Sequence, residues 1–375
     1  MPILAMLTLL HLYIGWRIAP DLPGTAAAVL FIALLVASAG SIGVAFAGLR
    51  GQGDRAAADR RSWLGMIALG SFSMLLVLTV LRDVLLLLAP LLGSVVALPP
   101  LATPTAVAVP VLAVVAVVLG AINARRTASV REVRVPIADL PAALDGFTIV
   151  QISDVHVGPT IKRGYVQRIV DAVNRLEGDA VAITGDLVDG RVHDLRADVQ
   201  PLAGLRSRHG TFFVTGNHEY YSGALEWIAH LRELGMRVLL NEHVVLDHGD
   251  ARLVMAGVTD YSSRHVDAPH GSDPRRAIDG ASTDAGLRVL LAHQPRSAPA
   301  AAEAGFDVQL SGHTHGGQFW PWNHFVRLQQ PYTAGLHRLR TLWVYTSRGT
   351  GYWGPAQRGG APAAHTQLKR VPAAG

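Results

Sequence analysis

Phe147–His156 reads FTIVQISDVH, a short apolar run that ends in an aspartate and a histidine. Its many β-branched residues predict a buried strand over Phe147–Ser153. Ala180–Thr184 and Thr211–Thr215 are runs of the same kind. The segments between and after these runs have a helical spacing of apolar residues, and they are Gly164–Leu176, Leu195–Arg206 and Leu225–Leu234. This alternation predicts an α/β fold with a largely parallel sheet and right-handed crossovers.

Further strand patterns follow with fewer helices between them, so we expect a second, mixed sheet. These patterns are Arg237–Leu240, Val244–Leu246, Arg252–Gly257, Leu287–Ala292, Val308–Ser311 and Leu342–Thr346. Val130–Ala143 contains Pro136 and Pro141 and is expected to form a linker and a first edge strand. Asp260–Asp284 is polar, rich in Gly, Pro and Ser, and without periodicity, which predicts an irregular insertion.

Polar residues follow directly on five of these predicted strands. The clusters read DVH at 154–156, GDLVD at 185–189, GNHE at 216–219, HQP at 293–295 and GHTH at 312–315. Ligands bind at the carboxyl ends of the strands in open α/β sheets. A single Asp or His there is more often a turn or cap residue, but five such ends deliver three Asp, five His and one Asn to one rim. The set therefore predicts a binding site.

These residue types predict a metal site. Imidazoles, carboxylates and an amide oxygen without sulfur suit Mn²⁺, Fe, Zn²⁺ or Mg²⁺, and the chain has no cysteine. About seven ligands are too many for one catalytic ion, so we expect two divalent ions that share a carboxylate. The D-x-H and H-x-H pairs are expected to point the same way, because side chains two apart in a strand do so. Gly185, Gly216 and Gly312 would allow sharp turns.

The series D-x-H, G-D-x-x-D, G-N-H-E, H and G-H-x-H, in this order, resembles the calcineurin-like metallophosphoesterase superfamily. The resemblance covers about Phe147 to Arg370. Three local sequences are similar to those of the membrane-anchored bacterial branch, which includes enzymes similar to UDP-2,3-diacylglucosamine pyrophosphatases. They are Gly216–Tyr221 (GNHEYY), Gly312–Gln318 (GHTHGGQ) and Arg348–Arg358 (RGTGYWGPAQR). The resemblance implies an α-β-β-α sandwich with two mixed sheets, and we place this domain at residues 146–375.

The resemblance also implies a role for each matched residue. The first metal ion would be held by Asp154, His156 and His315, the second by Asn217, His293 and His313, and Asp186 would bridge them. His218 would donate a proton to the leaving group, with Asp189 orienting its ring. The two ions would hold and activate a bridging water for in-line attack on phosphorus. The chain departs from the pattern at 362–365 (PAAH), where an acidic residue often follows the proline, and we expect this to affect only a terminal strand.

Residues 1–122 differ sharply in composition from the rest of the chain. They carry only ten of the 61 charged residues and are predicted to form a transmembrane region of about four helices, with 123–145 as linker and first edge. The predicted spans are Met1–Trp16, Gly24–Leu49, Trp63–Leu81 and Leu101–Ala121. Val84–Leu98 is short and contains Pro90 and Gly93, so it would extend the third helix, lie at the interface, or form a fifth span.

The arginines of the loops predict the orientation. One cluster lies between the second and third spans and another follows the last span, and they are Arg50, Arg55, Arg60 and Arg61, then Arg125, Arg126, Arg131 and Arg134. Arginine-rich short loops stay in the cytoplasm. We therefore predict a multi-pass protein of the inner membrane with both termini and the catalytic domain on the cytoplasmic side. Arg82-Asp83 is interpreted as a helix-end pair neutralised by its neighbours in preference to a transport site.

Together these features predict a membrane-anchored, dinuclear-metal-dependent phosphoesterase for phosphodiester or pyrophosphate bonds. Its partners would be membrane lipid and a phosphate ester, such as the lipid-linked nucleotide sugar UDP-diacylglucosamine. Two alternatives stay open, namely an esterase for soluble phosphate esters or nucleotides, and a regulatory or transport protein with a phosphoesterase domain. No nucleic-acid partner is expected, since no basic run is interleaved with aromatics. Four tryptophans would either form an apolar mouth or pack the last strands, and they are Trp320, Trp322, Trp343 and Trp353.

Overall fold

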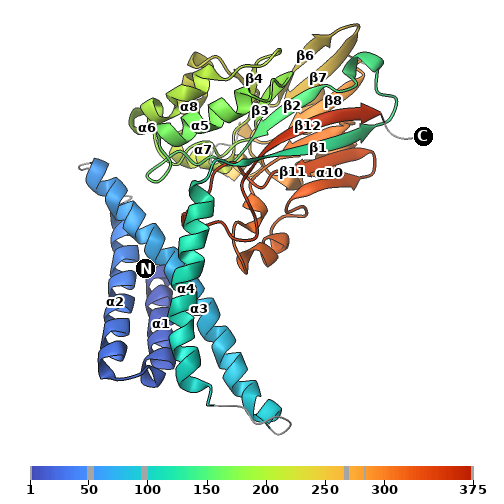
Figure 1. Cartoon of the computed structure of the whole chain (residues 1–375). Helices are drawn as coiled ribbons and strands as arrows, with labels where there is room; N and C mark the ends of the chain where they lie inside the picture. The colour runs from blue at the N-terminus through green and yellow to red at the C-terminus, as the bar shows by residue number, and fades with distance from the viewer. Residues whose placement is uncertain (1, 49–54, 94–99, 266–269, 283, 373–375) are drawn as a thin grey trace. The chain divides into compact units, whose positions relative to one another are not determined.

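The computed structural model of the chain describes residues 2–48, 55–93, 100–265, 270–282 and 284–372 (Figure 1). The chain divides into two compact units. The first, the helical unit, contains Met1–Arg125 together with Gly354–Gly359. The second, the α/β unit, contains Arg126–Trp353 and Gly360–Gly375.

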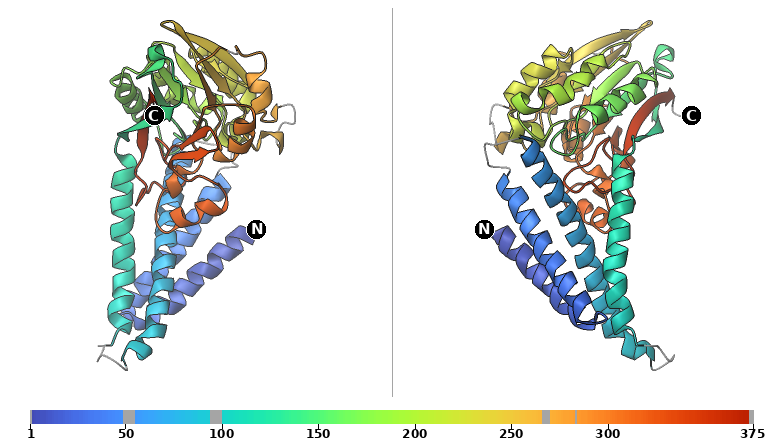
Figure 2. Two further views of the ribbon diagram at one scale, coloured as in Figure 1. Left: turned by 90° about the vertical axis from the view of Figure 1, so that its right-hand side faces the viewer. Right: turned by 60° about the vertical axis from the view of Figure 1, so that its left-hand side comes forward.

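The helical unit contains four long apolar helices, α1 (Pro2–Ile18), α2 (Thr25–Gly48), α3 (Arg55–Gly93) and α4 (Ala102–Arg125). Each of the four is long and apolar enough to cross a membrane. Helix α3 packs against α1, α2 and α4, and α1 also packs against α2 (Figure 2). Within the described residues, Val84–Gly93 continues α3, which agrees with the first of the three alternatives for that segment. Residues 94–98 lie outside the described part.

Arg82 and Asp83 lie well inside α3, so the expectation of a helix-end pair is wrong. Their side chains form hydrogen bonds with different partners. Arg82 forms an ion pair with Asp21 and donates to the carbonyl oxygen of Arg17 at 2.8 Å. Asp83 accepts from Arg17 Nε at 2.8 Å and from Tyr13 Oη at 2.6 Å. The expected neutralisation by neighbours is therefore present, although the guanidinium of Arg82 is buried and does not reach solvent.

The segment Gly354–Gly359 packs with the helices although it lies far along the chain from them. The amide of Gln357 lies against Gly70 of α3, where a Cβ would collide with it. A Cβ at Gly120 of α4 would come within 3.3 Å of Gln357 Cβ, and the backbone N–H of Arg358 donates to Gly120 O at 3.0 Å. Two helical glycines thus provide the space in which this segment lies.

Two six-stranded mixed sheets form the α/β unit. In order across the first sheet the strands are β1 (Ser129–Ile137), β12 (Ala364–Pro372), β2 (Thr148–Ile152), β3 (Ala180–Ile183), β4 (Thr211–Phe213) and β5 (Arg237–Val238). In the second they are β10 (Gly335–Leu339), β11 (Leu342–Thr346), β9 (Val308–Ser311), β8 (Leu287–Leu291), β7 (Ala251–Gly257) and β6 (Glu242–His248). Strands β2 to β5 are parallel, as are β7, β8, β9 and β11. The predicted fold of two mixed sheets is therefore confirmed, but β5 belongs to the first sheet, β10 was not predicted, and β12 was expected only as a terminal strand without bounds.

The inner faces of the two sheets form the main core. Ile149 and Phe212 from the first sheet pack in one cluster with Leu253 and Val289 from the second, and all four are fully buried. The helices are α5 (Arg163–Asn174), α6 (Val192–Val199), α7 (Asn217–Ser222), α8 (Ala224–Glu233), α9 (Pro274–Ile278) and α10 (Ala298–Glu303). Figure 1 shows α5, α6 and α8 beside the first sheet and α10 beside the second. The layers are therefore helix, sheet, sheet and helix.

The segment predicted as an irregular insertion contains one short helix. Asp273 caps α9, because its carboxylate accepts from the backbone N–H groups of Arg275 and Arg276 at 3.0 and 3.1 Å. The apolar spacing of the sequence missed α9, since five residues are too few to show a helical period. Residues 266–269 and 283, which belong to the same predicted insertion, lie outside the described residues.

Candidate metal centre

The five polar clusters of the sequence lie at the carboxyl ends of five strands. Strands β2, β3 and β4 of the first sheet precede DVH, GDLVD and GNHE, and β8 and β9 of the second precede HQP and GHTH. The site therefore takes residues from both sheets. The structure brings together eight of the predicted side chains, which are Asp154, His156, Asp186, Asp189, His218, His293, His313 and His315. The ninth residue, Asn217, directly precedes His218, whose backbone N–H donates to Asp186 Oδ1 at 3.0 Å.

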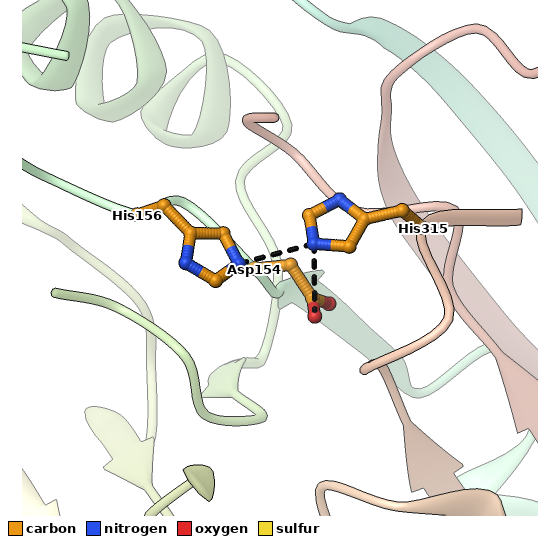
Figure 3. Close-up of side chains that lie close together, drawn as sticks. All are labelled: Asp154, His156 and His315. Atoms are coloured by element: carbon orange, nitrogen blue, oxygen red, sulfur yellow. Dashed lines mark hydrogen bonds and ion pairs between the residues drawn. The ribbon is translucent and has the colours of Figure 1, made fainter. Parts of the chain in front are cut away.

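Asp154, His156 and His315 form a first group that could hold a metal ion, with one ligand atom from each within 4.8 Å of the others (Figure 3). The Nε2 atoms of His156 and His315 are 3.0 Å apart, and His315 Nε2 is 3.7 Å from Asp154 Oδ1. His156 uses its other ring nitrogen, Nδ1, for a 2.9 Å hydrogen bond to Asp189. Its Nε2 lone pair is therefore turned toward His315 and the carboxylate, where a cation fits between them.

Asp186, His293 and His313 form a second such group. His293 Nε2 lies 3.1 Å from Asp186 Oδ2 and 3.2 Å from His313 Nδ1. His293 Nδ1 donates to the carbonyl oxygen of Thr184 at 2.7 Å, which leaves Nε2 as the atom that faces the group. Burial and the charge of His293 lower the pKa of His313 to about 3, so its ring is neutral and able to coordinate.

Asp186 lies between the two groups. Its Oδ2 atom is 3.9 Å from His156 Nε2 on one side and 3.1 Å from His293 Nε2 on the other. Asn217 is also buried, and its Oδ1 atom accepts no hydrogen bond from any described residue. A buried amide oxygen that accepts no hydrogen bond from the described residues is available as a metal ligand. The donors present therefore fit a dinuclear site.

His218, like His313, is partly open to solvent. Its Nδ1 is 2.6 Å from Asp189 Oδ1, and its side chain is 17% exposed. Burial lowers the pKa of His218, but the hydrogen bond to Asp189 and the charge of Asp186 outweigh burial and raise it to about 9. The ring is therefore protonated at neutral pH. The expected hydrogen bond between Asp189 and His218 is present, although Asp189 Oδ1 also bonds His156.

The backbone at the site differs from the expected extended strand ends. Five site residues have a left-handed backbone, with φ of 53° at Asp154, 56° at His156, 52° at Asp186, 71° at His313 and 51° at His315. This conformation is unfavourable for residues with a Cβ and costs about 1–3 kcal/mol at each such position. The D-x-H and H-x-H side chains therefore converge through strained turns and not through the alternation of a strand. Strain concentrated in this way is typical of functional sites.

The three glycines predicted to allow sharp turns have two different reasons for being glycine. Gly185 has a positive φ of 84°. Gly216 does not, but a Cβ there would collide with the carboxylate of Asp186, and a Cβ at Gly312 would collide with Ser153 and Asp154. Gly216 and Gly312 are therefore required because a side chain lies close to the backbone, and not because of an unusual backbone angle.

Glu219 is a structural member of the site that the sequence did not reveal. It is fully buried, and its carboxylate accepts from the backbone N–H groups of Asp186 at 3.0 Å, Leu187 at 2.7 Å and Gly216 at 2.6 Å. Burial and the charge of Asp186 raise the pKa of Glu219 to about 7. Glu219 thus joins the loop after β3 to the start of α7. The GNHE motif contained the residue, but nothing in the motif showed which N–H groups it would bind.

Two aromatic rings lie beside His218. The ring centroids of Tyr221 and Trp353 are 5.4 and 5.6 Å from that of His218, and both side chains are largely exposed. Trp353 is fixed by Gln318, which donates to its carbonyl oxygen and accepts from its N–H, each at 2.9 Å. Trp343 instead packs against the main core. Trp343 therefore packs with the last strands, whereas Trp353 is exposed beside the site.

Comparisons with known proteins agree with this geometry. Residues 147–317 match the family described as calcineurin-like phosphoesterase. A transmembrane protein with metallophosphoesterase domain from Bos taurus is 42% identical over 72% of this chain and 62% of its own length. A protein of the same description from Danio rerio is 38% identical over 66% of this chain and 58% of its length. The chain thus spans less than two thirds of these two relatives.

A metallophosphoesterase of Aquifex aeolicus is 33% identical over 65% of this chain and 93% of its own length. Among solved structures, a 5'-nucleotidase precursor from Thermus thermophilus is 19% identical, covers 55% of this chain and 49% of its own, and has a TM-score of 0.39. The named relatives support a transmembrane metallophosphoesterase, and they do not point specifically to UDP-2,3-diacylglucosamine pyrophosphatases.

Proposed function

Because this chain belongs to the calcineurin-like metallophosphoesterase family and is a membrane-associated, metal-dependent phosphoesterase, we propose that it hydrolyses phosphodiester or pyrophosphate bonds in a membrane-associated substrate. The observation that carries this proposal is the meeting of two histidine and carboxylate groups at Asp186. The buried Asn217 oxygen, which has no donor among the described residues, supports it.

We assign the ligands to two divalent ions of Mn, Fe, Zn or Mg. Asp154, His156 and His315 would hold the first, Asn217, His293 and His313 the second, and Asp186 both. When bound, such a pair of ions supplies an activated water nucleophile and neutralises the charge on the phosphoryl oxygens. Lewis-acid chemistry of this kind needs no cysteine and no second cofactor.

His218 is the proposed proton donor to the leaving-group oxygen. Its pKa of about 9 keeps the ring protonated at neutral pH, and its partial exposure leaves an edge open to substrate. Asp189 is the proposed orienting residue, since its 2.6 Å hydrogen bond to Nδ1 leaves Nε2 to donate. Nε2 is also only 3.9 Å from Asp186, which places the donor next to the metal groups.

A membrane-associated substrate is supported by the four helices that are long and apolar enough to cross a membrane, since such helices would hold the catalytic unit at a bilayer. Phospholipids and UDP-linked acylated sugars such as UDP-diacylglucosamine are the proposed class. A soluble nucleotide ester is a second candidate, favoured by the exposed rings of Tyr221 and Trp353 beside His218. Aromatic faces of this kind bind a nucleobase by stacking.

The test is hydrolysis by the purified full chain with Mn²⁺. The substrates are bis-p-nitrophenyl phosphate, p-nitrophenyl phosphate and UDP-diacylglucosamine in mixed micelles, with Asp186→Asn as the inactive control. Turnover of the acylated nucleotide sugar with a higher kcat/KM than both aryl esters would support a membrane-associated substrate. Hydrolysis of soluble nucleotide esters alone would favour the second candidate.

We propose that the catalytic unit faces the cytoplasm of the inner membrane. The support is the arginines that flank the helices, among them Arg60 and Arg61 in the first turns of α3 and Arg125 at the end of α4. A cytoplasmic reporter fused after Gly375 should be active, and a fused periplasmic alkaline phosphatase should not. Strong phosphatase signal at that position would contradict the orientation without affecting the assigned chemistry.

A further inference from the structure

Four large apolar side chains are exposed close together on one loop of the α/β unit. We call Trp320, Trp322, Phe325 and Leu328 the aromatic patch, and Leu328 is 80% exposed. Soluble proteins rarely expose so many large apolar side chains within nine residues unless they bind something. The segment that carries the patch forms short 3-10 turns, Trp322–His324 and Val326–Leu328, and is part of the orange region outside the two sheets in Figure 1.

The loop is held at its base, so the patch is a fixed feature of its surface. Gly317 has a φ of 79° and lies so close to Asn323 that a Cβ would collide with it. Thr314 Oγ1 donates to the carbonyl oxygen of Thr333 at 2.7 Å, and Arg296 donates to that of Gln329. These contacts close the loop on the segment that carries His313 and His315, while the large side chains at its tip stay exposed.

The stretch of chain that carries the patch has charged residues of one sign only. No Asp or Glu follows Asp307, whereas residues 308–375 contain six arginines and one lysine. Arg327 lies within the patch segment and is exposed, as are Arg338 and Arg340 of the adjoining β10 hairpin. An exposed apolar surface on a stretch of chain whose charged residues are all cations suits an anionic lipid surface, because it combines burial of aromatic side chains with attraction to phosphate headgroups.

A bilayer is also the partner that is always within reach. Helix α4 ends at Arg125 and strand β1 begins at Ser129, so only three residues join the last candidate span to the α/β unit. Tryptophan is enriched where proteins meet the headgroup region, and tryptophan, phenylalanine and leucine make up the buried face of interfacial helices. We infer that the aromatic patch inserts into the surface of an anionic bilayer and anchors the loop beside the metal centre there. The inference concerns docking and does not depend on the proposed substrate.

The absence of cysteine in the chain permits a direct test. A nitroxide spin label is attached to Leu328→Cys in the full chain, reconstituted in vesicles that contain phosphatidylglycerol. The matched control is Leu225→Cys on α8, where the leucine is 65% exposed. The measurement is the collision rate of each label with oxygen, which concentrates in lipid, and with a water-soluble nickel chelate.

We expect the label at 328 to collide mainly with oxygen and the label at 225 mainly with nickel. In vesicles of neutral lipid alone, the preference at 328 should weaken. Equal access of nickel to both labels would overturn the inference. Spin–spin broadening at 328 that disappears on dilution with unlabelled chain would also overturn it, by showing that a second copy covers the patch.

A second variant links the patch to turnover. Trp322→Ser combined with Phe325→Ser should raise KM several-fold for a substrate presented in anionic vesicles and leave kcat/KM for soluble bis-p-nitrophenyl phosphate unchanged. An equal loss for both substrates would point to damage at the site and against lipid docking. The label experiment needs no catalysis, so it remains decisive if the proposed substrate is wrong.

Discussion

The helical unit and the metal centre both bury charged and polar side chains, but they treat them differently. In the helical unit, the buried Arg82 pairs with Asp21, and the half-buried Arg17 pairs with Asp83. In the metal centre, imidazole nitrogens face one another at 3.0 and 3.2 Å, and an amide oxygen is buried with no donor among the described residues.

The difference separates structural burial from binding. A buried polar group must find a partner, because leaving it without one costs about 1–3 kcal/mol. The chain supplies that partner itself around α3. At the candidate metal centre the chain places ligand atoms close together without a cationic partner among the described residues. Five residues with a left-handed backbone hold them there. Strain together with missing donors marks the region that a bound ion completes.

Substitution of the shared carboxylate should test this difference most severely. Asp186→Asn removes a charge that faces both metal groups, so we expect fewer than two metal ions per chain and loss of turnover. The matched control is Asp260→Asn, a buried carboxylate that accepts from Gln294 at 3.1 Å and belongs to neither group. Elemental analysis that finds two full equivalents in Asp186→Asn would contradict the bridging assignment.

Removal of the proposed proton donor should have a smaller effect. His218→Ala is expected to keep both metal ions and to reduce kcat by about 10²–10⁴, the usual contribution of a positioned acid. The loss should be larger for an alkyl ester than for p-nitrophenolate, which hardly needs a proton to leave. His270→Ala is the control, since this ring bonds the hydroxyl of Tyr220 and is a member of neither metal group. If His218→Ala loses metal, or slows both leaving groups equally, the acid assignment is wrong.

The sequence predicted the parts of the site that depend on order along the chain. Strand ends and five motifs were enough to bring together nine residues from both sheets. It did not predict how the residues converge, because left-handed backbone at Asp154 or His315 leaves no trace in an apolar pattern. The role of Glu219 was not predicted for a related reason. It depends on the backbone N–H groups of Asp186 and Leu187, which lie 33 and 32 residues earlier in the chain.

The same limit applies to the fold. Periodicity located the buried parallel strands, whose apolar runs are continuous. It missed β10, with burial that is only partial, and β12, which alternates with polar residues and lies between β1 and β2. Packing of Gly354–Gly359 with the helices could not be anticipated, because it depends on gaps left by Gly70 and Gly120.

In the helical unit the expected effect is on stability alone. Arg82→Met removes the cation beside Asp21 and the donors to Arg17 O and Ala102 O. Breaking a fully buried ion pair lowers the free energy of unfolding by about 3–5 kcal/mol. We expect a smaller loss here, because the Asp21 side chain is 37% exposed. We expect a lower thermal midpoint, with unchanged metal content, against the exposed control Arg61→Met. Loss of metal from Arg82→Met would show that the helices help to build the site.

The smallest effect on stability is expected at Gln357 of the helical unit, whose side-chain amide has a buried nitrogen without a hydrogen-bond partner among the described residues. Gln357 Nε2 is buried and donates to no described residue. Unlike the orphaned oxygen of Asn217, it is a donor, and it lies against Gly70 and not among imidazoles and carboxylates. A buried donor without an acceptor destabilises the folded state. Gln357→Met, which keeps the volume, should therefore raise the free energy of unfolding by about 1 kcal/mol. A slightly higher thermal midpoint with unchanged kcat is the expected result, measured beside Gln329→Met on the exposed loop. If kcat falls instead, the amide of Gln357 serves the reaction, and an unsatisfied donor would mark function in this protein just as an unsatisfied acceptor does.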